Sequence, residues 1–267
     1  MQTRISCRFF QSFLLILVGS TFLFSQNQPP ASDSQAVTLA QKSVAALTGG
    51  VSISDVALSG NAIWTTGPDT ETGTATLSAL GIGESRIDLA LPSGTRTEIR
   101  DASTGTPLGK WVVPSGTSGK FVFHNCQTDA AWFYPALGSL AGGRNVVFSY
   151  IGQESRNGAT VQHIRSYVYP SVQFIGATPN FQQLSTEDFY LDVTTFLPVA
   201  LTFSAHPDSD TSRNILVEIN FLDYQAVNGV TVPMHIQKYM GGTLLMDLTV
   251  SRAAFNTGIP SSTFSVN

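Results

Sequence analysis

Apolar residues occupy alternate positions in five segments of the C-terminal half of the chain. These segments are 189–193, 199–203, 215–221, 232–236 and 244–250. Because successive side chains of a strand point to opposite faces of a sheet, the segments together predict a continuous antiparallel sheet with one apolar face and one wet face. Residue pairs typical of tight hairpin turns support this order of strands and occur at Asn157-Gly158, Asn228-Gly229 and Gly241-Gly242.

One helix is predicted ahead of the strands. Asp33 and Ser34 are good N-cap residues, apolar residues then recur at helical spacing as far as Leu47, and Gly49-Gly50 ends the helix. From Val51 onward, short β-branched and aromatic runs separated by turn residues predict about eleven strands. The region 128–140 is rich in aromatic residues and predicts a second short helix or a helical loop.

These helical segments are too small to cover the whole apolar face of so large a sheet. Two arrangements would bury the rest of that face. Two sheets could close on each other as a sandwich, or one strongly bent sheet could wrap around the helices and leave a partly filled apolar hollow. The pattern of residues alone is compatible with both arrangements.

The first 25 residues have the pattern of a secretory signal peptide. Arg4 and Arg8 precede an apolar stretch that ends at Phe24, and the chain becomes polar at Gln26. We expect cleavage after Ser25, so that 1–25 is the signal peptide, 26–32 a spacer and 33–267 a single domain. An uncleaved anchor is the alternative, but the apolar stretch of about 16 residues is shorter than the ~20 that a membrane-spanning helix needs. The expected location is therefore periplasmic or secreted.

The composition of the chain excludes some classes of function. The chain has 267 residues and a formal net charge of −4, and only 12% of its residues are charged. No basic excess is present to bind phosphate backbones, so we expect no nucleic-acid partner. Removal of the signal peptide would leave one cysteine, Cys126, which cannot form an internal disulfide. Stability must then come from packing.

Few residues indicate chemistry. The chain contains no His-Glu-x-x-His, Cys-x-x-Cys or Gly-x-Ser-x-Gly motif. His124-Asn125-Cys126 offers two soft ligands where a zinc site needs three or four. Glu187, Asp188 and Asp192 could include a catalytic carboxylate pair, but strand alternation places Asp188 and Asp192 on the wet face. We therefore expect a non-enzymatic protein without a metal or cofactor.

The apolar residues are better candidates for a binding site, because pockets for apolar ligands are mainly hydrophobic with few polar groups. Three adjacent aromatic residues at 132–134 cannot all face one core from a short helix, so at least one should point to solvent, a partner or a cavity, and the three form a candidate lid. The candidate ligand-binding residues are Trp132, Phe133, Tyr134, Phe189, Leu191, Leu201, Phe203, Val217, Ile219, Met234, Ile236, Met246 and Leu248.

One stretch of the C-terminal half carries a family resemblance. It reads Phe221-Leu-Asp-Tyr224-Gln-Ala-Val-Asn228-Gly229-Val-Thr-Val-Pro233-Met-His-Ile236 and is followed by the Gly241-Gly242 turn, Leu248-Thr-Val250, Phe255-Asn256 and Phe264. Together with the early helix that ends at Gly49-Gly50, this pattern resembles the LolA-like family of periplasmic lipoprotein carriers, the outer-membrane lipoprotein-sorting family. The resemblance covers about half of the residues that follow the expected cleavage site, and its motifs describe hairpins rather than catalytic groups.

The resemblance implies a mainly β fold, in which a curved antiparallel sheet forms a half-open barrel with an N-terminal helix and a short helical lid. It also implies that the hollow accepts acyl chains and that an arginine fastens the lid, for which Arg86, Arg96 and Arg100 are open candidates. We expect a periplasmic protein that binds lipid, an acyl chain or a lipoprotein, for transport to the outer membrane, with a membrane-associated receptor as a further partner. The alternative is a secreted, closed β-sandwich that serves as an adhesion or carbohydrate-binding module.

Overall fold

The computed structural model describes residues 29–81, 83–143, 145–156, 158–170 and 181–266. The expected signal peptide, its cleavage site after Ser25 and the first part of the spacer lie outside the described residues, as does Asn157 of one expected turn. Within the described ranges, none of the helices combines the length and the apolar character that crossing a membrane requires.

The N-terminal helix forms where the sequence predicts it. Helix α1 (Ser34–Thr48) begins after Asp33, whose carboxylate accepts hydrogen bonds from the backbone N–H groups of Gln35 and Ala36 at 2.7 and 3.3 Å. It ends at Gly49, which adopts a left-handed conformation with a φ of 60°. The chain just before the helix is fixed to the sheet, because the backbone N–H of Asp33 donates to the carbonyl oxygen of Phe148 on β7 at 2.9 Å.

The rest of the described chain is dominated by one antiparallel sheet of thirteen strands, two more than the approximate number expected. The strands are β1 (Asp55–Thr66), β2 (Asp69–Leu80), β3 (Glu84–Leu91), β4 (Gly94–Asp101), β5 (Leu108–Val112), β6 (Ser118–Lys120), β7 (Val146–Arg156), β8 (Ala159–Val168), β9 (Glu187–Asp192), β10 (Pro198–Ala205), β11 (Ile215–Val227), β12 (Val230–Met240) and β13 (Thr243–Phe255). The five alternating segments lie in β9 to β13, so the predicted order of these strands is confirmed.

Strand order follows chain order with one exception. The order is β6-β5-β4-β3-β2-β1-β13-β12-β11-β10-β9-β8-β7, so the first and last strands of the chain pair near the middle of the sheet. The hairpins on either side of β12 use the expected turn residues, and Asn228, Gly229, Gly241 and Gly242 all have positive φ. Two chain-order meanders, β1–β6 and β7–β13, are thus joined by the β1–β13 pairing.

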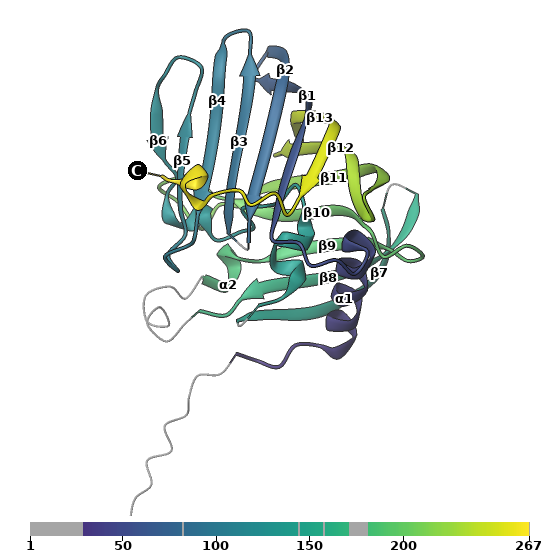
Figure 1. Cartoon of the computed structure of the whole chain (residues 1–267). Coiled ribbons are helices and arrows are strands. Elements are labelled where there is room, and N and C mark those ends of the chain that lie inside the picture. The colour runs from purple at the N-terminus through teal and green to yellow at the C-terminus, as the bar shows by residue number, and fades with distance from the viewer. Residues whose placement is uncertain (1–28, 82, 144, 157, 171–180, 267) are drawn as a thin grey trace, which may run out of the picture.

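The sheet is strongly bent and remains open. Figure 1 shows β2 to β6 running in a direction very different from that of β8 to β10, with α1 near the β7–β8 end. All thirteen described strands belong to this one sheet, and its edge strands β6 and β7 do not pair with each other. The expected mainly β, half-open arrangement is confirmed, and the two stacked sheets of a sandwich are not present in the described chain.

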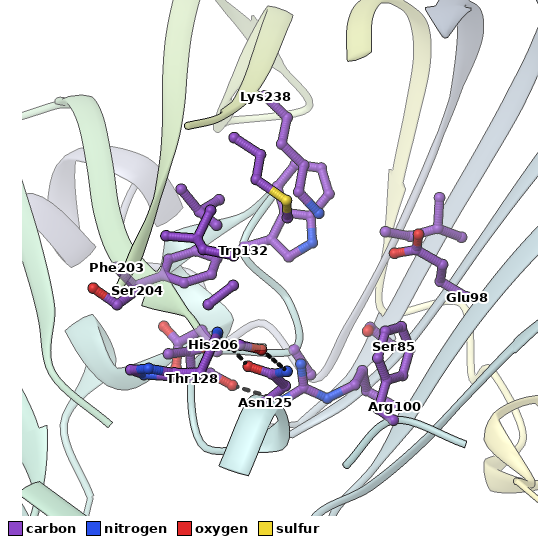
Figure 2. A pocket seen from close by; sticks show the side chains of 18 residues that line it. Ser85, Glu98, Arg100, Asn125, Thr128, Trp132, Phe203, Ser204, His206 and Lys238 are labelled. Carbon is purple, nitrogen blue, oxygen red and sulfur yellow. Dashed lines mark hydrogen bonds between the residues drawn. The ribbon is translucent and has the colours of Figure 1, made fainter. Parts of the chain in front are cut away.

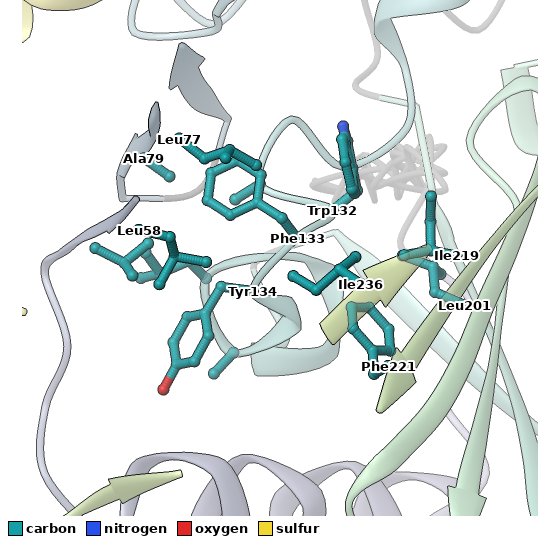
Figure 3. Packing of buried hydrophobic residues seen from close by; sticks show 14 of the residues in the cluster. Leu58, Leu77, Ala79, Trp132, Phe133, Tyr134, Leu201, Ile219, Phe221 and Ile236 are labelled. Atoms are coloured by element: carbon teal, nitrogen blue, oxygen red, sulfur yellow. The ribbon is translucent and has the colours of Figure 1, made fainter. Parts of the chain in front are cut away.

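Several short elements complete the described structure. They are the 3₁₀ turns η1 (Phe123–Cys126), η2 (Pro135–Leu137), η3 (Ser139–Ala141) and η5 (Ser261–Phe264), and the helix α2 (Phe181–Leu184). The expected second helix is therefore a helical loop, because Pro135 and Gly138 interrupt it. We call residues 128–141 the aromatic segment; together with α1 it packs inside the bend of the sheet (Figure 3).

Candidate functional site

A cavity of about 220 Å³ lies between the two meanders of the bent sheet. Strands β3 and β4 bound one side, β10, β11 and β12 bound the other, and η1 and the start of the aromatic segment lie between them. Figure 2 shows the side chains that line it. They are Ser85, Ile87, Glu98, Arg100, Phe121, Asn125, Thr128, Asp129, Ala130, Trp132, Phe203, Ser204, Ala205, His206, Ile215, Val217, Lys238 and Met240.

One wall of the cavity is apolar. Phe203 on β10 and Val217 on β11 are directly opposite each other in the antiparallel register, so their side chains lie on the same face of the sheet. Trp132 of the aromatic segment also lines the cavity and is only 5% exposed. An aromatic and aliphatic wall of this kind suits an apolar ligand.

Another part of the lining is polar and tightly held. The side-chain amide of Asn125 donates to the carbonyl oxygen of His206 at 2.7 Å and accepts from its backbone N–H at 2.9 Å, which ties η1 to the end of β10 (Figure 2). The His206 side chain is 3% exposed, and its Nε2 atom has no hydrogen-bond partner among the described residues. Arg100 Nη2 on β4 donates to the carbonyl oxygen of Thr128 at 2.9 Å.

Two buried carboxyl groups fix the aromatic segment beside the cavity. Glu187 on β9 is 1% exposed and accepts hydrogen bonds from the backbone N–H of Asp129 at 2.6 Å and from the hydroxyl of Ser139. Asp129 in turn accepts the backbone N–H of Ser139 at 2.8 Å. Burial raises the pKa of Glu187 well above its usual value, and the charge of Asp129 raises it further. Burial likewise raises the pKa of Asp129.

Lys238 introduces a positive charge on the inner face of β12. It lies opposite Ile219 on β11 and Met246 on β13, both buried, and its Nζ is 4.5 Å from the centroid of the Trp132 ring. Burial lowers the pKa of Lys238, whereas the charge of Glu98 acts to raise it. The ammonium group is thus stabilised by an aromatic face and by a carboxylate that reaches the cavity from the opposite meander.

The structure distinguishes the three candidate arginines. Arg86 pairs with its neighbour Asp88 at 2.6 Å, and Arg96 pairs weakly with Glu98 at 3.5 Å. Arg100 is the candidate that bonds to the aromatic segment, through the carbonyl oxygen of Thr128. Burial lowers the pKa of Arg100, although Cys126 and Glu187, among other nearby groups, act to raise it.

The predicted ligand-binding residues divide into three groups. Trp132, Phe203 and Val217 line the cavity, and Met246 lines a smaller adjoining hollow together with Trp132 and Lys238. Met234 is partly buried and borders a shallow depression near Tyr224 and His235. The other residues are buried in the hydrophobic core around α1 and the aromatic segment: Phe133, Tyr134, Phe189, Leu191, Leu201, Ile219, Ile236 and Leu248 (Figure 3). The expectation that the three aromatic residues at 132–134 cannot all face one core is wrong, because the irregular helical loop buries Trp132, Phe133 and Tyr134 in the same hydrophobic core, and Trp132 also lines the cavity.

Sequence reasoning missed Lys238 and Glu98, and it named Glu187 as a candidate carboxylate without its partner Asp129. A signal for Lys238 was available, because it continues the alternation of Val232, Met234 and Ile236 and must therefore face inward if they do. Arg96, Glu98 and Arg100 likewise alternate along β4. Charged residues at every second position of a strand share one face of the sheet. This pattern was the available signal for a charged inner surface.

The other candidate chemical groups have structural partners. Burial alone would raise the pKa of Asp188, but the hydrogen bonds from His163 and Arg165, each at 2.8 Å, hold it below the usual value. Asp192 accepts the backbone N–H groups of the turn that follows β9. Cys126 is a buried free thiol. The described residues contain no cluster of three or more His, Cys, Asp or Glu side chains that could hold a metal ion.

Comparisons with known proteins identify the fold of the chain. No family model matches the chain, and no curated protein matches it in sequence. Among solved structures, it is similar to a protein domain from Vibrio parahaemolyticus described as an outer membrane lipoprotein-sorting domain, with 15% identity, a TM-score of 0.57, and coverage of 86% of this chain and 96% of that one.

Two further solved structures are also similar to this chain. A DUF1329 family protein from Desulfovibrio piger is 10% identical with a TM-score of 0.56, and the match covers 89% of this chain and 98% of that one. A LolA superfamily protein from Nitrosomonas europaea is 9% identical with a TM-score of 0.54, covering 86% and 97% respectively. The bent, open sheet that encloses α1 and the aromatic segment is a LolA-like fold.

Proposed function

We propose that the protein is a non-enzymatic carrier that binds an acyl chain of a lipid or lipoprotein in this cavity. The observation that carries the proposal is the apolar wall of Trp132, Phe203 and Val217 inside an open sheet, beside an aromatic segment that is held by side-chain hydrogen bonds. Each methylene buried against such a wall contributes about 0.8 kcal/mol, so an acyl chain binds without any catalytic group.

In this proposal the aromatic segment is the lid. Its contacts to Arg100 and Glu187 join it to both meanders, so breaking them would release it from the sheet. Withdrawal of Phe133 and Tyr134 would extend the cavity over the buried inner residues of β9 to β13, including Leu201, Ile219 and Ile236. The remaining predicted ligand-binding residues would then contact the distal part of a longer chain.

The cellular setting of this carrier is proposed from the sequence and the fold together. The pattern of residues 1–25 supports export, and the LolA-like fold supports a role in moving acylated cargo across the periplasm to the outer membrane. A membrane-associated receptor would receive the cargo there.

The proposal is tested by filling the cavity. Ala205 on β10 lines it, so Ala205→Phe should occupy ligand space, whereas Ala226→Phe adds the same side chain at an exposed position of β11. We expect the purified protein to take up the uncharged fluorophore N-phenylnaphthylamine and to release it to hexadecanol. Ala205→Phe should weaken uptake by about tenfold, and Ala226→Phe should leave it unchanged.

Equal uptake by both variants would place binding outside this cavity. A wild-type protein that takes up neither the fluorophore nor hexadecanol would overturn the carrier function itself. Thermal unfolding of both variants shows whether the added phenyl group has disturbed the fold rather than the cavity.

A further inference from the structure

Three cations lie close together beside Glu98 on the inner surface that β4 and β12 share, and the carboxyl of Asp129 also lines the cavity. Alternation along β4 places Arg96, Glu98 and Arg100 on one face, and Glu98 and Arg100 line the cavity. Lys238 reaches the same space from β12 and also lines two adjoining hollows, where it meets Arg96. Three cations therefore surround one carboxylate on this part of the wall.

The cations are incompletely paired. The single ion pair among these four groups is the long contact of 3.5 Å between Arg96 Nη2 and Glu98 Oε1, and the buried Nε of Arg96 has no hydrogen-bond partner in the described chain. Lys238 makes no ion pair with any described residue and rests on the Trp132 ring. Arg100 donates to a neutral carbonyl, and the nearby carboxyls of Asp129 and Glu187 are occupied by hydrogen bonds to the aromatic segment.

These cations act on one another. Besides burial, the like charges of Arg100 and Arg96 also lower the pKa of Lys238, against the opposing effect of Glu98. Partly buried charges of one sign are costly unless a counter-charge joins them. An anionic group placed between Lys238 and its two arginine neighbours would remove the repulsion and gain charge-assisted hydrogen bonds.

We propose that the cavity selects a single-chain amphiphile with an anionic headgroup, a carboxylate or a phosphate, which Lys238 binds while the chain lies against Trp132, Phe203 and Val217. This inference rests on the proposed carrier function and adds the chemistry of the ligand. The cavity volume of about 220 Å³ is below the ~300–1,000 Å³ of pockets for drug-sized ligands, so it favours a ligand with one acyl chain over a ligand with two. Arg96 and Arg100 flank the headgroup and strengthen its attraction to the site.

The test compares ligands that share one chain and differ in headgroup. Palmitate, hexadecyl phosphate and hexadecanol compete with N-phenylnaphthylamine for the purified protein, each below its critical micelle concentration. We expect at least one of the two anions to bind about tenfold more tightly than the alcohol, and the stronger of them identifies the headgroup as carboxylate or phosphate. The preference should shrink as salt is raised.

Three variants assign the preference to a residue. Lys238→Met removes the ammonium group but keeps an apolar chain of similar length, and it should abolish the preference, so that the anions no longer bind more tightly than hexadecanol. Lys238→Arg should retain the preference. Lys42→Met is the matched control, because Lys42 also lies over an aromatic ring, that of Phe196 at 4.6 Å, but at an exposed position of α1 outside the cavity lining.

The outcomes separate the two proposals. If the wild type binds hexadecanol and the anions equally well, the charge selection is overturned and the carrier function stands. If Lys42→Met loses the preference as much as Lys238→Met does, net charge rather than the cavity is responsible, and the assignment of Lys238 is overturned. Failure of the wild type to bind any of the three amphiphiles or the fluorophore removes both proposals together.

Discussion

Arg100 and Thr128 join the first meander to the aromatic segment. The guanidinium Nη2 of Arg100 on β4 donates to the carbonyl oxygen of Thr128 at 2.9 Å, at the edge of the cavity and at the first residue of the segment (Figure 2). The contact runs from the strand to the aromatic segment without an intervening carboxylate. A bond from a charged donor to a neutral acceptor contributes more than an ordinary hydrogen bond, yet it can exchange with water when the segment moves.

Loss of this bond should loosen the lid. Arg100→Met should speed uptake of N-phenylnaphthylamine several-fold in stopped-flow fluorescence and lower the free energy of unfolding by about 1–3 kcal/mol. Arg252→Met, at an exposed position of β13, removes an equal charge and should change neither quantity. Unchanged uptake by Arg100→Met would show that ligand entry does not require the segment to move.

Gly138 allows the aromatic segment to approach Asp129. A Cβ at position 138 would lie 1.9 Å from Asp129 Oδ2, which is buried with its hydrogen bonds to Ser139. Gly138→Ala should therefore destabilise the protein by about 1–3 kcal/mol in urea unfolding. Gly143→Ala is the control, because its Cβ would meet only the Val146 side chain at 3.3 Å and should cost far less.

Because of the buried Glu187, the free energy of unfolding should fall as the pH rises. Its folded-state pKa is raised, so the protonated form favours folding below the usual pKa of glutamate, and this contribution is lost as the pH rises through the raised value. Glu187→Gln stays neutral, so the wild type should lose stability relative to this variant by at most about 1.4 kcal/mol per pH unit. Urea unfolding of both proteins at several pH values measures the difference, and parallel profiles would contradict the expectation.

Asp55 should give the free energy of unfolding the opposite pH dependence to that of Glu187. It is a buried residue at the start of β1, and although burial acts to raise its pKa, hydrogen bonds from Thr257 and Gly258 hold the pKa below the usual value. Its contribution is therefore present above the usual pKa of aspartate and is lost as the pH falls through the lowered value. Asp55→Asn should cost about 2 kcal/mol near neutral pH, measured by urea unfolding, whereas exposed Asp69→Asn should cost almost nothing.

The sequence predicted β9 to β13 well because each of these strands alternates apolar and polar residues for several positions, and because Asn228-Gly229 and Gly241-Gly242 permit only a few turn types. It predicted the site less completely. An apolar face looks the same whether it contacts a ligand or a packed loop, and here α1 and Phe133 fill most of it. The charged lining depends on the bend that brings β4 toward β12, and no local pattern encodes that approach.

The pairing of β1 with β13 also makes the cavity depend on a strand that does not line it. The cavity's lining residues in the described chain run from Ser85 to Met240, so all of them precede β13, which begins at Thr243. Within each meander, the paired strands are neighbours in sequence and can form hairpins locally. The two halves of the sheet are joined through β13, so a chain that ended before Thr243 would carry every lining side chain and lack the strand pairing that holds β4 and β12 on opposite sides of one space.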